Sequence, residues 1–590
     1  MSEFGYPMPR YFQNMPKIGR SLNSVDAENE AELKKIEQNI FAEIKRSTES
    51  GTPDEKMHKR GQLTPMERLN QLIDADTWSP INSLWNPYGN EDGSTCVFTG
   101  IAKIAGKWAI VVVSDHKKLA GVWVGGQAYK LTHACHMAIK LRLPLVYVLN
   151  CSGIKLNEQE RVMAGRMCGG TPFYRHMELA QEGLPVIVGI FGTNPAGGGY
   201  HAATPTIQVA HANANMAVGG AGIVGGMNPK GHVDEKAAMA LIEATKKAGK
   251  TSPLGSIETH YNYTGLFREV YGTEEGVLEA LRKYVDACPS YKENFFRVAP
   301  AQEPALPTED LYSLLPVNQR RAYKPIEILA RLTDNSEFNE FKPEYGPEII
   351  CGLARFDGML AGIVMNNQGI ITNYPEYRKN GVGLGGKLYR QGLLKMNEFA
   401  NLCARDCVPL IWMQDTTGID VGQDAEEEEL LALGASLIYA CQAAKVPQME
   451  ITLRKGTGAA HYVMGGPMGD HTNVLSIGTA ATEIYVMHSE TAAAAMYSRR
   501  LVRDYDAGVS LQASIDAMNA MIQDYHDKSR PAYCAQHGFV DEIVPLSNVR
   551  KYICAFIGAA YQNPASICPF DHMLLPRMIR DWNNMKNWKK

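Results

Sequence analysis

The sequence predicts an α/β protein in which one domain occurs twice, and two observations lead to this prediction. The apolar run 145–149, which is followed by Gly153, recurs as 410–414, which is followed by Gly418. Short runs rich in β-branched residues, such as 109–113, alternate with segments of helical periodicity. Because these runs are continuously apolar, they are typical of parallel strands covered by helices on both faces.

Matching segments occur in the same order along most of the chain. Pro185, at the start of the next apolar run, pairs with Pro447 at nearly the separation of Gly153 from Gly418. The other pairs, in chain order, are 65–78 with 325–338, 100–103 with 352–355, and 125–130 with 385–390. A repeat of this length indicates a duplicated domain. Two copies of one site-building unit indicate two related ligands that are handled together.

The duplication predicts two domains and a linker. Residues 1–300 form the predicted first domain, which includes an amphipathic helix over 25–48. Residues 301–324 are polar and carry several prolines, which is typical of a linker, and residues 325–590 form the second domain. Helices between strands are expected over 128–140 and 387–403.

The composition is that of an ordinary globular protein, with 21% charged residues and a formal net charge of −4. This charge and the lack of a basic stripe argue against nucleic acid as a partner. The 12 cysteines include no CxxC pair, so we expect a reduced, cytosolic chain without a disulfide framework or a metal site. No apolar run reaches the roughly 18 residues that a membrane-spanning helix needs.

Each copy has two glycine-rich junctions at which a strand passes into a loop. Two such loops lying side by side can aim two backbone N–H groups at one oxygen atom, which is the geometry of an oxyanion hole. Each such donor contributes about 3–4 kcal/mol to a transition state, and glycine leaves room for a carbonyl to approach. The candidate catalytic residues are Ser152, Gly153, Gly197 and Gly198 in the first copy and Gly418, Ile419, Gly458 and Ala459 in the second.

For any single loop, the alternative is that its glycines only permit a tight turn. Recurrence of the loops in both copies favours function. His201 and His461 follow the second loop of each copy. Each could support its loop, but we expect histidines that are satisfied by local hydrogen bonds.

These loops resemble those of the carboxyltransferase subunits of biotin-dependent acyl-CoA enzymes, which belong to the crotonase superfamily. The resemblance also covers 60–68 near the start and 454–460 in the second copy. It implies a duplicated ClpP/crotonase-type ββα superhelix. The first copy would hold the thioester oxygen of an acyl-CoA. The second would hold the ureido oxygen of biotin, with Gly418, Gly458 and Ala459 as cofactor-binding positions.

The resemblance also assigns a role to Lys155, beside the first loop. It matches an arginine on the CoA side of the family's site, so contact with a CoA phosphate is expected. The alternative is a solvated surface lysine. Cys151, Ile154 and Ala459 depart from the pattern of the carboxylases in this family.

Segments such as 192–201, 216–222 and 414–420 are most similar to family members that decarboxylate their substrate and export sodium. The resemblance therefore implies that the γ-carboxylate of glutaconyl-CoA moves to N1 of biotin, giving crotonyl-CoA after protonation. The chain has no Ala/Val-Met-Lys-Met turn for biotin attachment, so a separate carrier subunit is expected. The family also implies a homodimer and a sodium-pumping membrane subunit that holds the chain at the inner face of the cell membrane.

Two other functions remain open. One is the β subunit of an ATP-dependent carboxylase of the propionyl-CoA or methylcrotonyl-CoA type. The other is a non-catalytic scaffold, which bulky residues at the glycine positions would have indicated.

Overall fold

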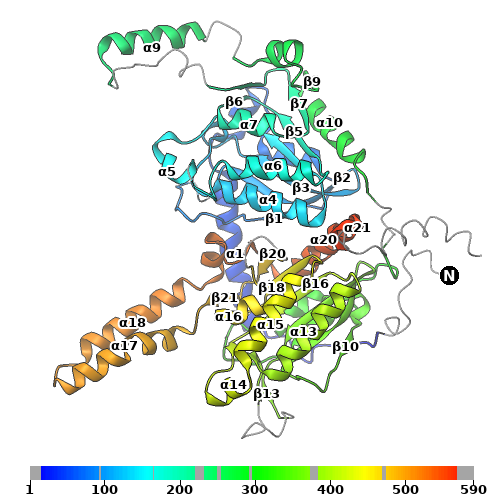
Figure 1. The fold of residues 1–590 in the computed structure, drawn as a ribbon, viewed down its shortest axis with the longest axis vertical. Helices are drawn as coiled ribbons and strands as arrows, with labels where there is room; N and C mark the ends of the chain where they lie inside the picture. The colour runs from blue at the N-terminus through cyan, green and yellow to red at the C-terminus, as the bar shows by residue number, and fades with distance from the viewer. Residues whose placement is uncertain are drawn as a thin grey trace, which may run out of the picture. The chain divides into compact units, whose positions relative to one another are not determined.

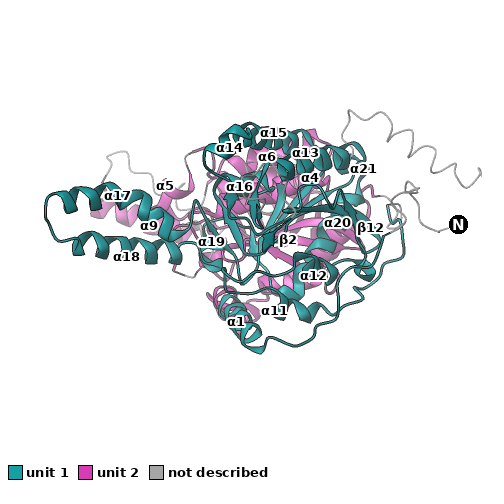
Figure 2. Cartoon of the chain, turned by 90° about the horizontal axis from the view of Figure 1, so that it is seen from below, with its two compact units in different colours: residues 1–42, 291–590 teal, residues 43–290 magenta. Residues whose placement is uncertain are grey.

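The computed structural model describes residues 15–567 apart from 92, 94, 164, 220–231, 249–253, 291–295, 373–382 and 468–472. The chain forms two compact units (Figure 2). Residues 43–290 make up the first-copy unit, and residues 1–42 with 291–590 make up the second-copy unit. The boundary falls inside helix α1 (Ala27–Glu49), so most of the predicted N-terminal helix belongs to the second-copy unit.

The first-copy unit is built on a seven-stranded sheet (Figure 1). β1 to β3 pair antiparallel, and β3, β4, β5, β7 and β9 pair parallel. In sheet order the strands are β1 (Ser79–Ile81), β2 (Val97–Ile104), β3 (Lys107–Ser114), β4 (Leu145–Leu149), β5 (Val186–Ile190), β7 (Ile207–His211) and β9 (Glu269–Tyr271). Every residue of β4 and β5 is buried, as their continuous apolarity predicts.

The second-copy unit repeats this sheet with the same order and the same strand directions. Its strands are β10 (Asn339–Phe341), β11 (Ile349–Phe356), β12 (Met359–Asn366), β16 (Leu410–Gln414), β18 (Gln448–Thr452), β20 (Asn473–Gly478) and β22 (Glu542–Ile543). The predicted duplicated α/β fold is therefore confirmed.

Four two-stranded sheets complete the strands: β6 (Thr193–Pro195) with β8 (Asn215–Ala217), β19 (Lys455–Thr457) with β21 (Glu483–Tyr485), β15 (Lys387–Leu388) with β17 (Gly418–Ile419), and β13 (Ile370–Ile371) with β14 (Gly383–Leu384). The helix predicted from residue 387 begins instead at Arg390. The reason is that Lys387 and Leu388 form parallel bridges to Gly418 and Ile419.

The helices of the first-copy unit are α2 (Asp54–His58), α3 (Pro65–Leu72), α4 (Gln127–Leu141), α5 (Gln159–Val162), α6 (Thr171–Gln181), α7 (Gly197–Ala203), α9 (Glu235–Ala248) and α10 (Glu274–Asp286). Those after residue 300 are α11 (Leu311–Leu314), α12 (Pro325–Ala330), α13 (Arg390–Arg405), α14 (Gln423–Glu427), α15 (Leu430–Ala443), α16 (Gly458–Val463), α17 (Ser489–Asp506), α18 (Gln512–Asp527), α19 (Pro531–Gln536), α20 (Val549–Gln562) and α21 (Pro564–Ile567). Among the described residues, no helix is long and apolar enough to cross a membrane.

Equivalent side chains anchor the two sheets. Asp74 accepts hydrogen bonds from the backbone N–H groups of the turn at 105–106 and from Arg282 Nη2, at 2.8 Å. Asp334 does the same with the turn at 357–358 and with Arg550 Nη2, also at 2.8 Å. The repeat read from the sequence therefore extends to individual side-chain contacts.

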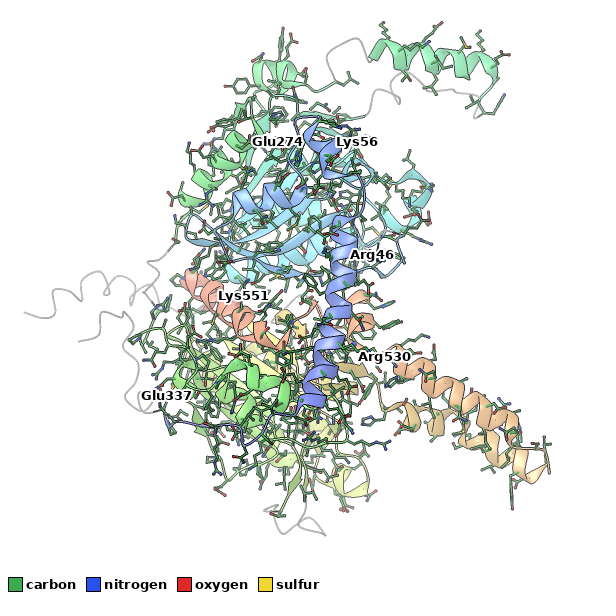
Figure 3. All side chains as sticks on the ribbon, turned by 180° about the vertical axis from the view of Figure 1, so that it is seen from behind. Arg46, Lys56, Glu274, Glu337, Arg530 and Lys551 are labelled. Carbon is green, nitrogen blue, oxygen red and sulfur yellow. The ribbon has the colours of Figure 1, made fainter. Side chains whose placement is uncertain are left out.

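Within the first-copy unit, a buried ion pair joins two helices. Arg68 of α3 is fully buried and donates from Nε to Glu274 Oε2 at 2.8 Å; Glu274, which begins α10, is labelled in Figure 3. A buried pair of this kind requires both partners, because either charge alone would be left in an apolar interior. It joins the two helices that pack on the same core as β3, β4 and β5.

Candidate active site

The first loop of the first-copy unit follows β4. Gly153 has φ of +109°, a conformation that residues with a side chain rarely adopt. The N–H of Trp123 donates to Gly153 O at 2.8 Å, and the N–H of Lys155 donates to Trp123 O at 2.8 Å. Because backbone groups alternate along an extended segment, the N–H of Ile154 faces away from Trp123.

The second loop of this unit lies beside the first. It runs from β6 through Ala196 into α7, whose first N–H groups have no partner inside the helix. Buried Asn194 joins the loops: the N–H of Cys151 donates to its Oδ1 at 2.8 Å, and its Nδ2 donates to Phe191 O at 2.9 Å. A Cβ atom at Gly198 would lie only 2.5 Å from Cys151 O, which shows how closely the loops approach.

The first loop of the second-copy unit has the same form. Gly418 has φ of +116°, and its N–H donates to Thr416 Oγ1 at 3.3 Å. The N–H of Asp420 donates to Leu388 O at 3.1 Å. The N–H of Ile419 therefore faces away from β15, as that of Ile154 faces away from Trp123.

The second loop of this unit again lies beside the first. It runs from β19 into α16, and Gly458 has φ of +53°. Thr457 Oγ1 donates to Thr416 O at 2.7 Å, and the N–H of Thr416 donates to Lys455 O at 2.7 Å. The structure therefore brings the predicted residues of each copy together at one place, although their role as oxyanion donors stays a prediction.

The backbone angles set the register between the copies. Ala196, with φ of +50°, stands where Gly458 stands in the second copy. Gly197 is therefore equivalent to Ala459, Gly198 to Ala460, and Ile154 to Ile419. The predicted residues did not include Ile154, Ala196 or Ala460. Alignment of the two copies at the ends of β4 and β16 and of β6 and β19 could have found them.

Open space adjoins both pairs of loops. A Cβ atom at Gly197 or Gly418 would meet no atom within 4 Å, and one at Gly153 would meet only Pro195 Cγ, at 3.9 Å. The residues present therefore fit the approach of a planar thioester or ureido carbonyl to the backbone N–H groups.

The two sites differ in charge. In the second-copy unit, buried Asp415 accepts from Arg454 Nε at 2.8 Å and lies 3.6 Å from Lys455 Nζ. Burial lowers the pKa of Lys455. The equivalent first-copy positions hold the uncharged residues Asn150, Gly192 and Thr193. Arg454 and Lys455 thus face two carboxylates, those of Asp415 and Glu483, so the second site carries more charged groups next to its loops than the first.

The remaining first-copy candidates have local partners. Ser152 Oγ donates to Leu119 O at 3.0 Å, so its hydroxyl holds the neighbouring loop. Lys155 Nζ lies 2.5 Å from Glu158 Oε1, and this hydrogen bond raises the pKa of Lys155. The lysine expected to meet CoA is therefore partly exposed and paired within its own turn.

The two histidines differ. His461 is satisfied as expected, with Nδ1 3.1 Å from Gln414 Oε1. His201 is not: neither ring nitrogen has a hydrogen-bond partner among the described residues. Its ring lies 4.4 Å from that of Trp123 and 4.5 Å from that of Phe173, and burial holds its pKa well below the usual range. The expectation of local hydrogen bonds was wrong for His201, because aromatic rings enclose it.

Comparisons with known proteins agree with this architecture. The chain is 58% identical over 578 residues to the glutaconyl-CoA decarboxylase α subunit of Acidaminococcus fermentans, covering 98% of each chain. It is 26% identical over 502 residues to the β1 subunit of the biotin-dependent 3-methylcrotonyl-coenzyme A carboxylase of Mycobacterium tuberculosis, covering 84% of this chain and 88% of that one.

Among solved structures, the β subunit of geranyl-CoA carboxylase from P. aeruginosa superposes with a TM-score of 0.74 at 22% identity. The match covers 93% of this chain and 98% of that one and shows a shared fold. The family model for the carboxyl transferase domain matches residues 56–574. The chain belongs to the carboxyl transferase family, and its two pairs of loops lie within the matched region.

Proposed function

We propose that this chain is the carboxyltransferase subunit of a glutaconyl-CoA decarboxylase. It would move the γ-carboxylate of glutaconyl-CoA to N1 of carrier-bound biotin, and crotonyl-CoA would follow after protonation. The observation that carries this proposal is the pair of equivalent two-loop sites. The reaction has two carbonyl oxygens that gain negative charge, and the chain offers two places where a pair of loops lies side by side and could supply N–H donors. The relative that is 58% identical over nearly the whole chain supports the choice of substrate.

The first-copy loops are assigned to the acyl-CoA. Loss of the γ-carboxylate leaves a dienolate whose charge extends through the double bond to the thioester oxygen. The N–H groups beside Gly153 and Gly197 would stabilise this oxygen, while Ser152 and Asn194 hold the loops that carry them. The uncharged residues Asn150, Gly192 and Thr193 next to these loops suit a neutral thioester whose own carboxylate leaves.

The second-copy loops are assigned to biotin. When bound, biotin supplies N1 as the acceptor of the carboxylate, and the proton lost from N1 balances protonation of the dienolate. The N–H groups beside Gly418, Ile419 and Ala459 would hold the ureido oxygen as it gains charge. The cations Arg454 and Lys455 next to these loops support this assignment, because a nearby positive charge lowers the energy of an anion.

We further propose that biotin arrives on a separate carrier and that the chain acts as a homodimer. Both units expose large apolar residues at equivalent positions around their loops. These pairs are Leu156 with Val421, Tyr174 with Tyr439, Tyr200 with Tyr462, and Val218 with Val486. Two matching apolar faces allow a closed two-fold dimer in which the first-copy face of one subunit packs on the second-copy face of its partner. A membrane subunit coupled to sodium export would hold the dimer at the cytoplasmic face of the membrane.

The proposed function is tested by assaying the purified chain with glutaconyl-CoA and free biotin. We expect biotin-dependent loss of the γ-carboxylate and formation of crotonyl-CoA. Propionyl-CoA and 3-methylcrotonyl-CoA, supplied with carboxylated biotin, serve as comparison substrates. Efficient carboxylation of either, without turnover of glutaconyl-CoA, would instead assign the chain to an ATP-dependent carboxylase.

A further inference from the structure

A chain of buried polar side chains leads from the second-copy loops into the interior of the sheet. His461 Nδ1 lies 3.1 Å from Gln414 Oε1, and Gln414 Nε2 donates to Glu450 Oε1 at 2.7 Å. Glu450 also accepts from Thr452 Oγ1 at 2.5 Å and from Ser476 Oγ. All five side chains are buried, so solvent does not provide alternative partners.

At the equivalent, described positions of the first-copy unit there is no such chain, although the fold is equivalent. Leu149 ends β4 where Gln414 ends β16, and Val188 is the central residue of β5 where Glu450 is central in β18. Gly199 precedes Tyr200 as His461 precedes Tyr462. The same strands therefore fold with apolar residues at these positions, and the fold itself does not require a buried carboxyl group.

Such a group is costly to bury unless all its hydrogen bonds are made. Burial raises the pKa of Glu450 to about 7. Besides its three side-chain partners, the group faces Asp541, whose Oδ2 accepts from the N–H of Ser476. Its retention in only one of two equivalent sheets points to a task in the second site.

The hydrogen bonds between these side chains have a defined order of donors and acceptors. Glu450 Oε1 accepts from Gln414, which fixes the amide so that its Oε1 points to the histidine. That oxygen can only accept, so the hydrogen of His461 lies on Nδ1. Burial lowers the pKa of His461 to about 4, so the ring is neutral. The carboxyl group therefore sets the orientation of the ring through a single intervening residue.

Two members of this chain, Gln414 and His461, each adjoin a loop that carries a candidate donor. Gln414 directly precedes the segment 415–418, and His461 follows Ala459 in α16. A Cβ atom at Gly456 would lie 2.9 Å from His461 Nδ1, so the ring also packs tightly on β19. The hydrogen bond between the buried side chains of His461 and Gln414 thus fixes the distance between the two loops.

We propose that Glu450 is a positioning residue that holds the second-copy loops at the separation needed for the acceptor oxygen. It acts through Gln414 and His461 and does not touch the ligand. This inference rests on the proposed assignment of the second copy to biotin. It concerns the biotin step and leaves binding of the acyl-CoA unchanged.

The test compares Glu450→Leu with Glu450→Gln. Leucine removes the acceptor of Gln414 and leaves its amide unpaired, whereas glutamine keeps an acceptor oxygen for Gln414 and can donate its amide to Ser476 Oγ. We expect Glu450→Leu to lower kcat/KM for free biotin about ten- to a hundredfold, the usual effect of leaving one buried polar group unpaired. Glutamine should restore most of that loss, and the calorimetric affinity for glutaconyl-CoA should stay the same in both variants.

Gln448→Leu is the matched control. Gln448 lies two residues earlier on β18 and is equally buried, accepting from Trp412 Nε1 at 2.8 Å and donating to Cys441 O at 2.9 Å. These hydrogen-bond partners lie outside both loops, so loss of Gln448 should lower stability by a similar amount with kcat/KM for biotin unchanged. In addition, His461→Phe should cost no further activity in the Glu450→Leu background, because both changes interrupt the same series of hydrogen bonds.

If folded Glu450→Leu uses biotin as well as the parent does, or if Gln448→Leu loses as much activity, the positioning role is wrong while the proposed function stands. A parent chain that is itself inactive with glutaconyl-CoA and biotin would overturn the proposed function instead.

Discussion

At the scale of single residues, the two copies differ in which positions accept a side chain. Gly197 opens onto free space, and Ala459, its equivalent, already carries a Cβ atom. Gly198 and Gly458 are unlike them. A Cβ atom at Gly198 would meet Cys151 O at 2.5 Å, and one at Gly458 would meet Val486 O at 2.9 Å in a backbone conformation with positive φ. Bulk at Gly197 and Ala459 therefore tests the site, whereas bulk at Gly198 and Gly458 strains the fold.

We expect Gly197→Val and Ala459→Val to separate the two ligands. Either side chain obstructs the approach of an oxygen to the adjacent N–H groups and should slow carboxyl transfer about a hundred- to a thousandfold, the effect of losing one donor. Gly197→Val should weaken glutaconyl-CoA binding in calorimetry, and Ala459→Val should raise the biotin concentration needed for half-maximal rate. Equal acyl-CoA affinity in two folded variants would contradict the two-site assignment.

Gly198→Ala should destabilise the first-copy unit although it adds a single methyl group. Its Cβ atom would press on a backbone carbonyl, which cannot rotate away as a flexible side chain can, and such overpacking costs about 1–3 kcal/mol. Chemical denaturation followed by tryptophan fluorescence measures this loss, with Gly197→Ala as the control. Equal unfolding midpoints for the two variants would show that the loops separate easily.

At the scale of elements, each unit relies on an aspartate that joins a tight turn to a C-terminal helix. Asp74 and Arg282 are partly exposed, with side-chain exposures of 25% and 32%, whereas Asp334 and Arg550 are at 3% and 11%. An ion pair exposed to water contributes little, and breaking a buried one leaves an uncompensated charge. The same contact should therefore matter more in the second-copy unit.

Asp334→Ala is expected to lower the free energy of unfolding by about 3–5 kcal/mol, since it strands Arg550 and two backbone N–H groups. Asp74→Ala is the matched variant and should cost clearly less. Denaturant titrations of both proteins give the comparison. A larger loss for Asp74→Ala would mean that burial does not decide the strength of these anchors.

At the scale of the whole molecule, the chain offers two sites but no biotin-attachment turn. We therefore expect the purified chain to carry no covalent biotin, so that an avidin blot of the homogeneous 65.0 kDa species stays blank. The carrier subunit of the native complex provides the positive control. A strong avidin signal on the chain itself would remove the need for a separate carrier.

The sequence by itself determined the duplication, the α/β class and the strands around the loops. These features are encoded locally: continuous apolar runs such as 145–149 and 410–414 predict buried strands, and glycines at their ends predict unusual backbone angles. The loop residues chosen from those glycines do lie together in each unit. Composition and spacing were enough to predict these strands and loops, because each of the signals lies within a few consecutive residues.

Only the tertiary structure decided the backbone conformation of the sites and the contacts that hold them. Ala196 shares the positive φ of Gly458, but an alanine in a sequence does not indicate this conformation. The links from Asn194 to Cys151 and from Glu450 to Gln414 join residues on different strands. Glu450 lies among the mixed polar and apolar residues 448–452, which gave no sign of its partners, since pairing across a sheet depends on strand order and register, and neither is written in the local sequence.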